Sequence, residues 1–340
     1  MKRRSRALGT WLIGLGLAAS PALAEEVVPA EAASPAATPA AGVPNLFAEL
    51  LIVRPTIDDT AFVLRSPGST TFPNGTRESD EFDYEAGFRI GAGYEIAESG
   101  RKVELSYSRL EADATETING DFLWATVGNP DFAGSFTNYA GSAAARIDAD
   151  YQRIDLHVTQ PWRVAGAELG LEFGLEWADF RVGERYVFVN DTAPNTGVVS
   201  AASRSWGIGP EIGLGLGFEI CHACGIPGAF SLAAGSSIAL LLTDTNTRAS
   251  TVSSGAPALS VRDEETSRVI PAIHARAGFT YAVPVAEHVA ATASVGYQID
   301  TYLNGLTRAA FVDDVAPSLS ATHEYDFDLH GIYASVGVVF

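Results

Sequence analysis

Acidic, basic and histidine side chains recur at every second position in several segments of this sequence. In "RIDLH" the residues Arg153, Asp155 and His157 are spaced two apart, so a strand places all three on one face. A histidine beside a carboxylate is a pair that hydrolases use for acid–base catalysis, and a turn at 163–166 would put Glu172 roughly opposite Asp155. A single histidine on such a face is more often a hydrogen-bonded polar group. We therefore predict that the protein is not an enzyme and uses no cofactor or metal.

Strands of alternating polarity are the elements that position these residues. In "FDYEAGFRIGAGYEIA" (82–97) the apolar side chains share one parity, and the charged residues and glycines share the other. Because successive side chains of a strand point to opposite faces, the segment has one apolar face and one charged or bare face. We predict ten such strands, within a range of eight to twelve. They are 46–54, 82–97, 102–117, 147–160, 168–178, 206–220, 229–247, 264–282, 289–303 and 326–340.

The connections between these strands also alternate. Short turns are expected at 98–101, 163–166, 221–228 and 284–288, and long polar loops near 55–81, 118–146, 189–203, 248–262 and 304–325. An antiparallel meander with short turns at one end and long loops at the other is typical of an outer-membrane barrel, whose short turns face the periplasm. The predicted fold is an all-β, closed, antiparallel up-and-down transmembrane β-barrel.

A soluble β-sandwich is the competing hypothesis for alternating strands of this kind. A sandwich buries its apolar face and keeps charge outside, in strands of usually about five or six residues. Here charge and glycine share one face over longer runs, which fits lipid outside and a polar lumen inside. The barrel is therefore favoured.

The N-terminal segment and the overall charge define the compartment. Residues 1–24 begin with basic residues, continue with a short apolar run and end in Ala22-Leu23-Ala24, which is typical of a secretory signal peptide. Residues 25–44 are rich in Ala and Pro and are predicted to be a flexible periplasmic tether, and residues 45–340 form the barrel. The full chain carries 22 Lys+Arg against 41 Asp+Glu, an acidic balance that excludes nucleic-acid binding. We predict a cell outer membrane location in a Gram-negative bacterium.

The inward parity predicts a lumen lined by carboxylates on some strands and by basic residues on another. An acidic side facing a basic side would create a transverse field that favours small cations. The predicted pore-lining residues are Glu85, Arg89, Glu95, Arg153, Asp155, His157, Glu172, Glu176, Glu211, Arg268, His274, Arg276 and Asp300.

Three functions are compatible with this lumen. The first is a porin-like protein that passes small hydrophilic solutes or ions by passive diffusion, supported by the many inward glycines. The alternative is a plugged structural or adhesive surface barrel whose long extracellular loops bind partners, because a ten-stranded barrel leaves little room beyond its own side chains. The third is a barrel hydrolase. Outer-membrane lipid, lipopolysaccharide and the barrel assembly machinery are expected partners, and homo-oligomerisation stays open.

The C-terminal strand and the two cysteines carry separate predictions. In "HGIYASVGVVF" the side chains of Ile332 and Phe340 would face lipid and Tyr333 would face inward, and pairing with the first strand would close the barrel. An aromatic C-terminus, here Tyr333 and Phe340, is similar to the signal that the assembly machinery recognises. Cys221 and Cys224 in "CHAC" are predicted to form a local disulfide in a periplasmic turn.

Four segments together resemble the Legionella major outer membrane protein family. They are "NLFAELLIVRP" (45–55), "DYEAGFRIGAGYEI" (83–96), "VELSYSRL" (103–110) and the aromatic end "GIYASVGVVF". The resemblance extends over most of the mature chain as an order of strands and loops. It implies a pore-forming outer-membrane barrel and supplies no catalytic residue.

Overall fold

The computed structural model describes residues 42–58, 60–68, 74–128, 139–164, 167–191, 196–222, 227–253, 258–311 and 320–340. All regular structure in these ranges is β-strand, and none of their residues lies in a helix that could span a membrane. They belong to the compact unit Pro39–Phe340. The predicted signal peptide and most of the predicted tether lie outside the described residues.

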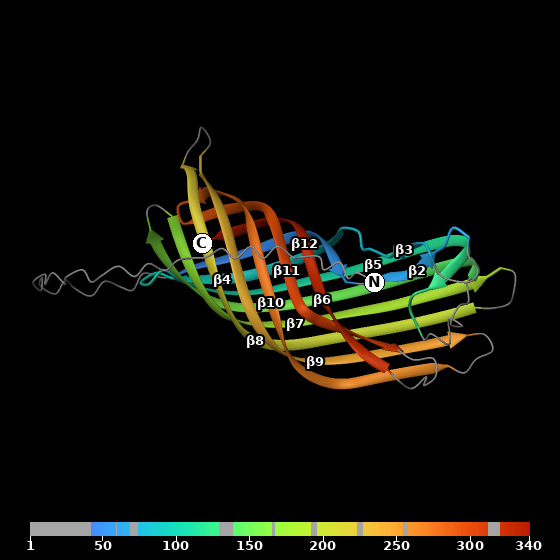
Figure 1. Ribbon diagram of the computed structural model, residues 1–340. Coiled ribbons are helices and arrows are strands. Elements are labelled where there is room, and N and C mark those ends of the chain that lie inside the picture. The colour runs from blue at the N-terminus through green and yellow to red at the C-terminus, as the bar shows by residue number, and fades with distance from the viewer. Residues whose placement is uncertain are drawn as a thin grey trace, which may run out of the picture. The chain divides into compact units, whose positions relative to one another are not determined.

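Ten of the twelve strands form a closed antiparallel ring (Figure 1). Neighbours in the ring follow chain order, and β1 closes it by pairing with both β4 and β12. The predicted number of strands and the predicted closure are therefore confirmed. The ten strands are β1 (Val43–Ile57), β4 (Glu85–Ile96), β5 (Arg101–Ala125), β6 (Tyr139–Val164), β7 (Ala167–Asn190), β8 (Thr196–His222), β9 (Ala229–Ser253), β10 (Leu259–Ala286), β11 (Val289–Phe311) and β12 (Ser320–Val339).

The strands are much longer than the sequence pattern predicted. β6, for example, has 26 residues, whereas about 9–11 tilted residues cross a bilayer. The predicted long loops at 118–146, 189–203, 248–262 and 304–325 are therefore wrong over most of their length, because paired strands continue through them. In these parts of the strands charged residues face outward and apolar residues face inward, a pattern that resembles a solvated loop when lipid is assumed outside.

A short pair of strands lies within the remaining predicted loop, 55–81. It consists of β2 (Ala61–Arg65) and β3 (Thr76–Ser79), and β2 pairs with the long-loop end of β5. β5 pairs with β4 only up to Arg109, so β4 does not cover this edge of β5 where β2 pairs with it. The pair of strands thus covers a strand edge that would otherwise stay unpaired.

The outward face divides the barrel into two parts. Near the short turns it carries a belt of large, exposed apolar side chains, which we call the apolar belt. Representative members are Ile90, Leu105, Phe173, Leu214, Val295 and Ile332. On β7 the belt extends from Leu169 to Trp177, which is the length that about 9–11 tilted residues need to span lipid.

Beyond the belt the outward face becomes charged, and we call this part the projecting half. It comprises β2, β3 and residues 109–125, 139–152, 178–190, 196–205, 243–253, 259–268, 301–311 and 320–329. Its exposed outward residues include Arg109, Glu111, Asp113, Arg146, Arg181 and Arg185. A strand of 26 residues at ~3.3 Å per residue and a tilt of ~45° covers roughly 60 Å, about twice the hydrocarbon thickness.

The polarity of the two faces is therefore reversed between the two parts. On β6, Asp155 and Arg153 face inward inside the belt, and the next inward residues, Tyr151, Ala149 and Ile147, are apolar and buried. The pairing of β6 with β7 has no bulge, so β6 keeps the same face inward along its length. The belt encloses a polar interior as a membrane barrel does, and the projecting half encloses an apolar core as a water-soluble barrel does.

Candidate functional site

Arg153 is the centre of a buried ion-pair network inside the apolar belt. Its guanidinium lies 2.6 Å from Asp155 and 3.1 Å from Asp300. It also approaches Glu176 at 3.7 Å and Glu211 at 3.5 Å. These acids come from β6, β7, β8 and β11, so one side chain connects strands on different sides of the ring.

His274 on β10 joins the same network from its other side. Its Nδ1 lies 2.7 Å from Oδ1 of Asp300 and 2.9 Å from the Arg153 guanidinium, and its Nε2 lies 2.9 Å from Oε2 of Glu176. Tyr302 donates a hydrogen bond of 2.9 Å to Oε1 of Glu176. Glu176, Glu211 and His274 lie close enough to offer one ligand atom each to a metal ion.

A second part of the network is centred on Glu49 of β1. Its carboxylate accepts hydrogen bonds of 2.9 Å from Arg89 and 2.8 Å from Arg276. Arg89 also donates to Ser108 at 2.9 Å, and the Arg276 guanidinium lies 4.3 Å from the ring centre of Tyr333. Charges buried in this way are satisfied by direct partners rather than by water.

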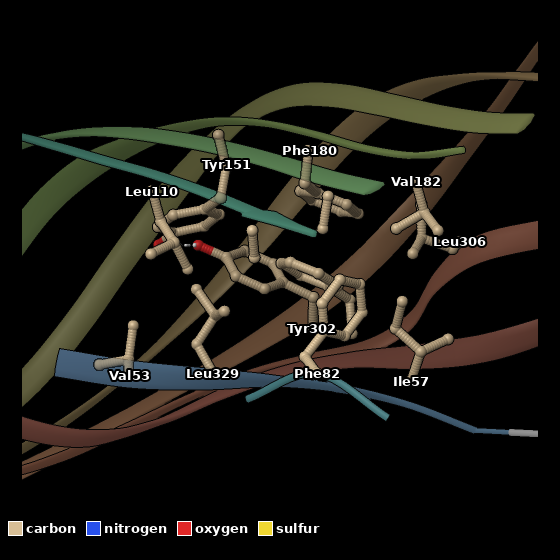
Figure 2. Close-up of a cluster of buried hydrophobic side chains, with 14 of the residues drawn as sticks. Val53, Ile57, Phe82, Leu110, Tyr151, Phe180, Val182, Tyr302, Leu306 and Leu329 are labelled. Atoms are coloured by element: carbon tan, nitrogen blue, oxygen red, sulfur yellow. Dashed lines mark hydrogen bonds between the residues drawn. The ribbon is translucent and has the colours of Figure 1, made fainter. Parts of the chain in front are cut away.

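Directly beyond the network, aromatic side chains from opposite sides of the ring meet. We call Tyr151, Phe180, Tyr302 and Phe327 the aromatic core. Phe180 of β7 stacks on Phe327 of β12 at 5.4 Å and lies 4.8 Å from Tyr302 of β11. Figure 2 shows Tyr302 between Tyr151 and Phe180, with its hydroxyl 3.0 Å from that of Tyr151. Because β6 and β7 lie across the ring from β11 and β12, these contacts fill the lumen at this level.

The lumen is also filled closer to the long loops. Phe62 of β2 is fully buried and stacks on Tyr186 of β7 at 5.7 Å. Arg308 of β11 pairs with Glu184 on the opposite strand β7. The projecting half thus has its own hydrophobic core, closed by a cross-ring ion pair.

On the short-turn side of the network, a cavity of about 120 Å³ remains. Small residues on β9, Gly235 and Ser237, form part of its lining, and Glu104, His157 and Glu172 contribute charge. His157 lies 3.8 Å from Glu104. The cavity ends at Arg153 and His274, so the ion-pair network separates it from the aromatic core.

The structure brings most of the predicted pore-lining residues together, but as ion pairs rather than as two opposed charged sides. Glu85 begins β4 and Glu95 lies near the short-turn end of that strand. The remaining predicted residues, Arg268 excepted, belong to the network or line the cavity. Whether any of them lines a conducting pathway stays a prediction.

Arg268 shares β10 with His274 and Arg276, but it lies in the projecting half, where it pairs with Glu324 at 3.2 Å and donates a hydrogen bond to the Gly305 carbonyl. The expectation that Glu172 lies opposite Asp155 is wrong. The residue opposite Asp155 is Glu176, and Glu172 pairs with Thr159. The pairing of β6 with β7 ends with Val164 opposite Ala167, whereas a turn at 163–166 would place Trp162 opposite Ala167, and this difference changes the register along both strands.

Sequence reasoning also missed residues that close the lumen. Glu49 is a single carboxylate in an apolar strand, which was a visible signal for an inward charge. The aromatic core was missed because its members share the inward parity with charged residues further along each strand. In "SYSRLEADA" the same inward parity passes from Ser106 and Ser108 to Leu110 and Ala112, and this change of character marks the boundary.

The C-terminal strand has the predicted orientation. Ile332 and Phe340 are about half exposed on the outside, and Tyr333 is buried inside. The role of Tyr333 and Phe340 in assembly stays a prediction. Cys221 is disulfide-bonded, but Cys224 lies outside the described residues, so the local pairing also stays a prediction.

Burial perturbs several titratable groups of the projecting half and its connections. Desolvation, together with the nearby charge of Glu116, raises the pKa of Asp80 to about 6. Burial also raises the pKa values of the Tyr186 and Tyr325 hydroxyls and lowers the pKa of Arg268. These shifts are those expected of groups packed in a low-dielectric core.

The closed ring of ten strands, with lipid-facing residues around charged ones, defines an outer-membrane β-barrel. A family model described as the Legionella pneumophila major outer membrane protein precursor matches residues 44–340. The chain belongs to this family, and the protein is an outer-membrane protein. The predicted family and location are confirmed.

Two solved structures are similar to this chain at low sequence identity. The outer membrane protease OmpT from Escherichia coli is 9% identical, with a TM-score of 0.45, over 89% of this chain and 97% of that chain. The P. putida toluene transporter TodX is 9% identical, with a TM-score of 0.33, over 89% of this chain and 90% of that chain. We draw no functional argument from these similarities. No curated protein matches the chain.

Proposed function

We propose that the protein is a plugged surface barrel, a membrane-anchored structural protein whose projecting half carries its long-loop end away from the bilayer to bind partners. One observation carries this proposal, namely that side chains from opposite sides of the ring are in contact. Phe180 stacks on Phe327, and Arg153 reaches Asp300. A solute would have to displace both the ion-pair network and the aromatic core to pass through the barrel.

The reversal of polarity along the strands supports the same function. A diffusion pore needs a hydrated interior along its full length, but the interior of the projecting half is a continuous hydrophobic cluster. Its members include Leu110, Ile147, Val182, Leu241, Ile270 and Leu306. Opening this part would expose apolar surface at a cost of about 25 cal/mol per Å², so the described core favours a closed barrel.

Porin-like passage of small hydrophilic solutes is the second candidate function. The polar cavity of about 120 Å³ on the short-turn side favours it, because its acidic lining would attract cations. Passage would require the ion-pair network and the aromatic core to move apart. We assign the protein no catalytic step, since Asp155 is held by Arg153 rather than by His157.

Single-channel recording in a planar bilayer separates the two candidates. The refolded mature chain is inserted, and its folded state is verified by heat-modifiable migration on gels. We expect a silent bilayer in the presence of folded, inserted protein. Discrete conductance steps, with a cation-biased reversal potential across a salt gradient, would refute the plugged barrel and support the porin.

If conductance steps occur, two matched variants test whether the conducting pathway includes the cavity. Arg276 lies inside the apolar belt and lines the cavity, whereas Arg268 lies in the projecting half. Arg276→Ser would increase cation preference if the cavity is part of a conducting path. Arg268→Ser, which removes the same charge outside the belt, serves as the control.

A further inference from the structure

Glu176, Glu211 and His274 form a compact cluster inside the barrel. They occupy inward positions on β7, β8 and β10, and one ligand atom from each lies within 4.8 Å of the others. Glu176 is fully buried, and the side chains of Glu211 and His274 are each 8% exposed. One imidazole with two carboxylates is a donor set that suits divalent transition metals.

Each of the three side chains is held through the atom that would not bind a metal. Nδ1 of His274 lies 2.7 Å from Asp300, and Oε1 of Glu176 accepts the Tyr302 hydroxyl at 2.9 Å. Oε1 of Glu211 lies 3.5 Å from the Arg153 guanidinium. Metal-binding histidines and carboxylates are oriented by such outer partners in known sites.

Of the remaining atoms, two contact each other and one has no hydrogen-bond partner among the described residues. Nε2 of His274 lies 2.9 Å from Oε2 of Glu176, so either a proton on Nε2 or a metal ion binds between these two atoms. Oε2 of Glu211 is buried and has no hydrogen-bond partner among the described residues. Buried oxygens normally have a partner, and two facing lone pairs need a proton or a metal ion between them.

The charge of the surroundings favours a cation as well. Four buried carboxylates, those of Asp155, Glu176, Glu211 and Asp300, lie around one guanidinium, that of Arg153, and one imidazole, that of His274. Excess negative charge is costly to bury without a compensating cation. A divalent ion would reduce this excess more than one proton on His274 does.

We propose that Nε2 of His274, Oε2 of Glu176 and Oε2 of Glu211 bind a divalent transition-metal ion of the Zn²⁺ class within the barrel. A fourth ligand position would open toward the cavity, whose lining includes both Glu211 and His274. Glu104 and Glu172 line the same cavity and would attract the ion toward the site. The nitrogen ligand favours Zn²⁺, Co²⁺ or Ni²⁺ over Mg²⁺ and Ca²⁺.

Cobalt titration tests the site directly. The folded, tag-free full-length mature barrel is stripped with a chelator, and Co²⁺ is added while visible absorption is recorded. We expect one Co²⁺ per chain, with d–d absorption that Zn²⁺ abolishes and excess Mg²⁺ does not. Glu211→Gln should weaken Co²⁺ binding by at least about tenfold, because it replaces the carboxylate whose oxygen has no other partner.

Glu172→Gln is the matched control. It removes the same charge from the lining of the same cavity and leaves the three ligands in place, so Co²⁺ affinity should change much less than in Glu211→Gln. The proposal is overturned if folded wild-type protein shows no Co²⁺-dependent absorption at millimolar Co²⁺. It is also overturned if the two variants, both heat-modifiable, bind Co²⁺ with equal affinity.

Discussion

Replacing Phe180 by alanine tests whether the lumen is packed or hydrated. Phe180 is fully buried and contacts two rings, Phe327 at 5.4 Å and Tyr302 at 4.8 Å. Truncating a buried phenylalanine to alanine costs about 3–5 kcal/mol, because transfer free energy is lost and a cavity remains. We expect Phe180→Ala to lower the free energy of unfolding by this amount, measured by urea titration of the barrel in lipid vesicles.

A lipid-facing phenylalanine provides the control for this measurement. Phe173 lies on the same strand, seven positions away within the apolar belt, and is 51% exposed. Lipid fills the space left by Phe173→Ala, so only a transfer loss of roughly 2 kcal/mol is expected. If Phe180→Ala changes stability by no more than about 0.5 kcal/mol, as an exposed residue would, the side chain faces water and the plugged lumen is refuted.

Two further predictions concern charges of the projecting half and its connections. Arg308→Met leaves the Glu184 side chain, which is 2% exposed, without its cross-ring cation. We expect this variant to lower the free energy of unfolding by about 3 kcal/mol, and the double variant with Glu184→Leu to recover most of this loss. Equal urea midpoints for the wild type and the single variant would contradict the buried pair. The pKa of Asp80 is raised from 3.8 to about 6, so the folded state binds this proton more tightly and the contribution to stability falls as pH rises from about 4 to 6. Asp80→Asn should remove this slope, and an unchanged slope in pH-dependent urea titrations would assign it to other groups.

Much of the membrane-embedded part could be predicted from alternation alone. In 84–96 and 206–220 the outward residues are apolar without exception, because lipid tolerates nothing else over that span. Phe82 has the same parity but lies before β4 and is buried in the core. This rule is local and needs no knowledge of neighbouring strands. It gave the number of strands, their inward and outward faces and the closing role of the C-terminal strand.

The length of the strands was harder to predict, because the apolar face of each strand is its outward face inside the membrane and its inward face beyond it. Beyond Gln152 on β6 and Ala178 on β7, water lies outside and the interior is apolar. Charged outward residues such as Arg181 and Arg185 then resemble loop residues when lipid is assumed outside. Alternation with inverted polarity was present in the sequence, but it indicates a strand only if a soluble barrel is considered at that position.

Within the apolar belt the sequence by itself determined which side chains face inward, and the tertiary structure alone decided what they meet there. Parity places Arg153, His274 and Tyr302 inside, yet it contains no information on the distance across the ring or on the relative heights of β6, β10 and β11. Those depend on the closure and register of all ten strands. The alternation depends only on whether each face of a strand contacts lipid, water or the barrel interior. The filling of the lumen depends on side chains that are far apart in the chain and occupy the same small volume.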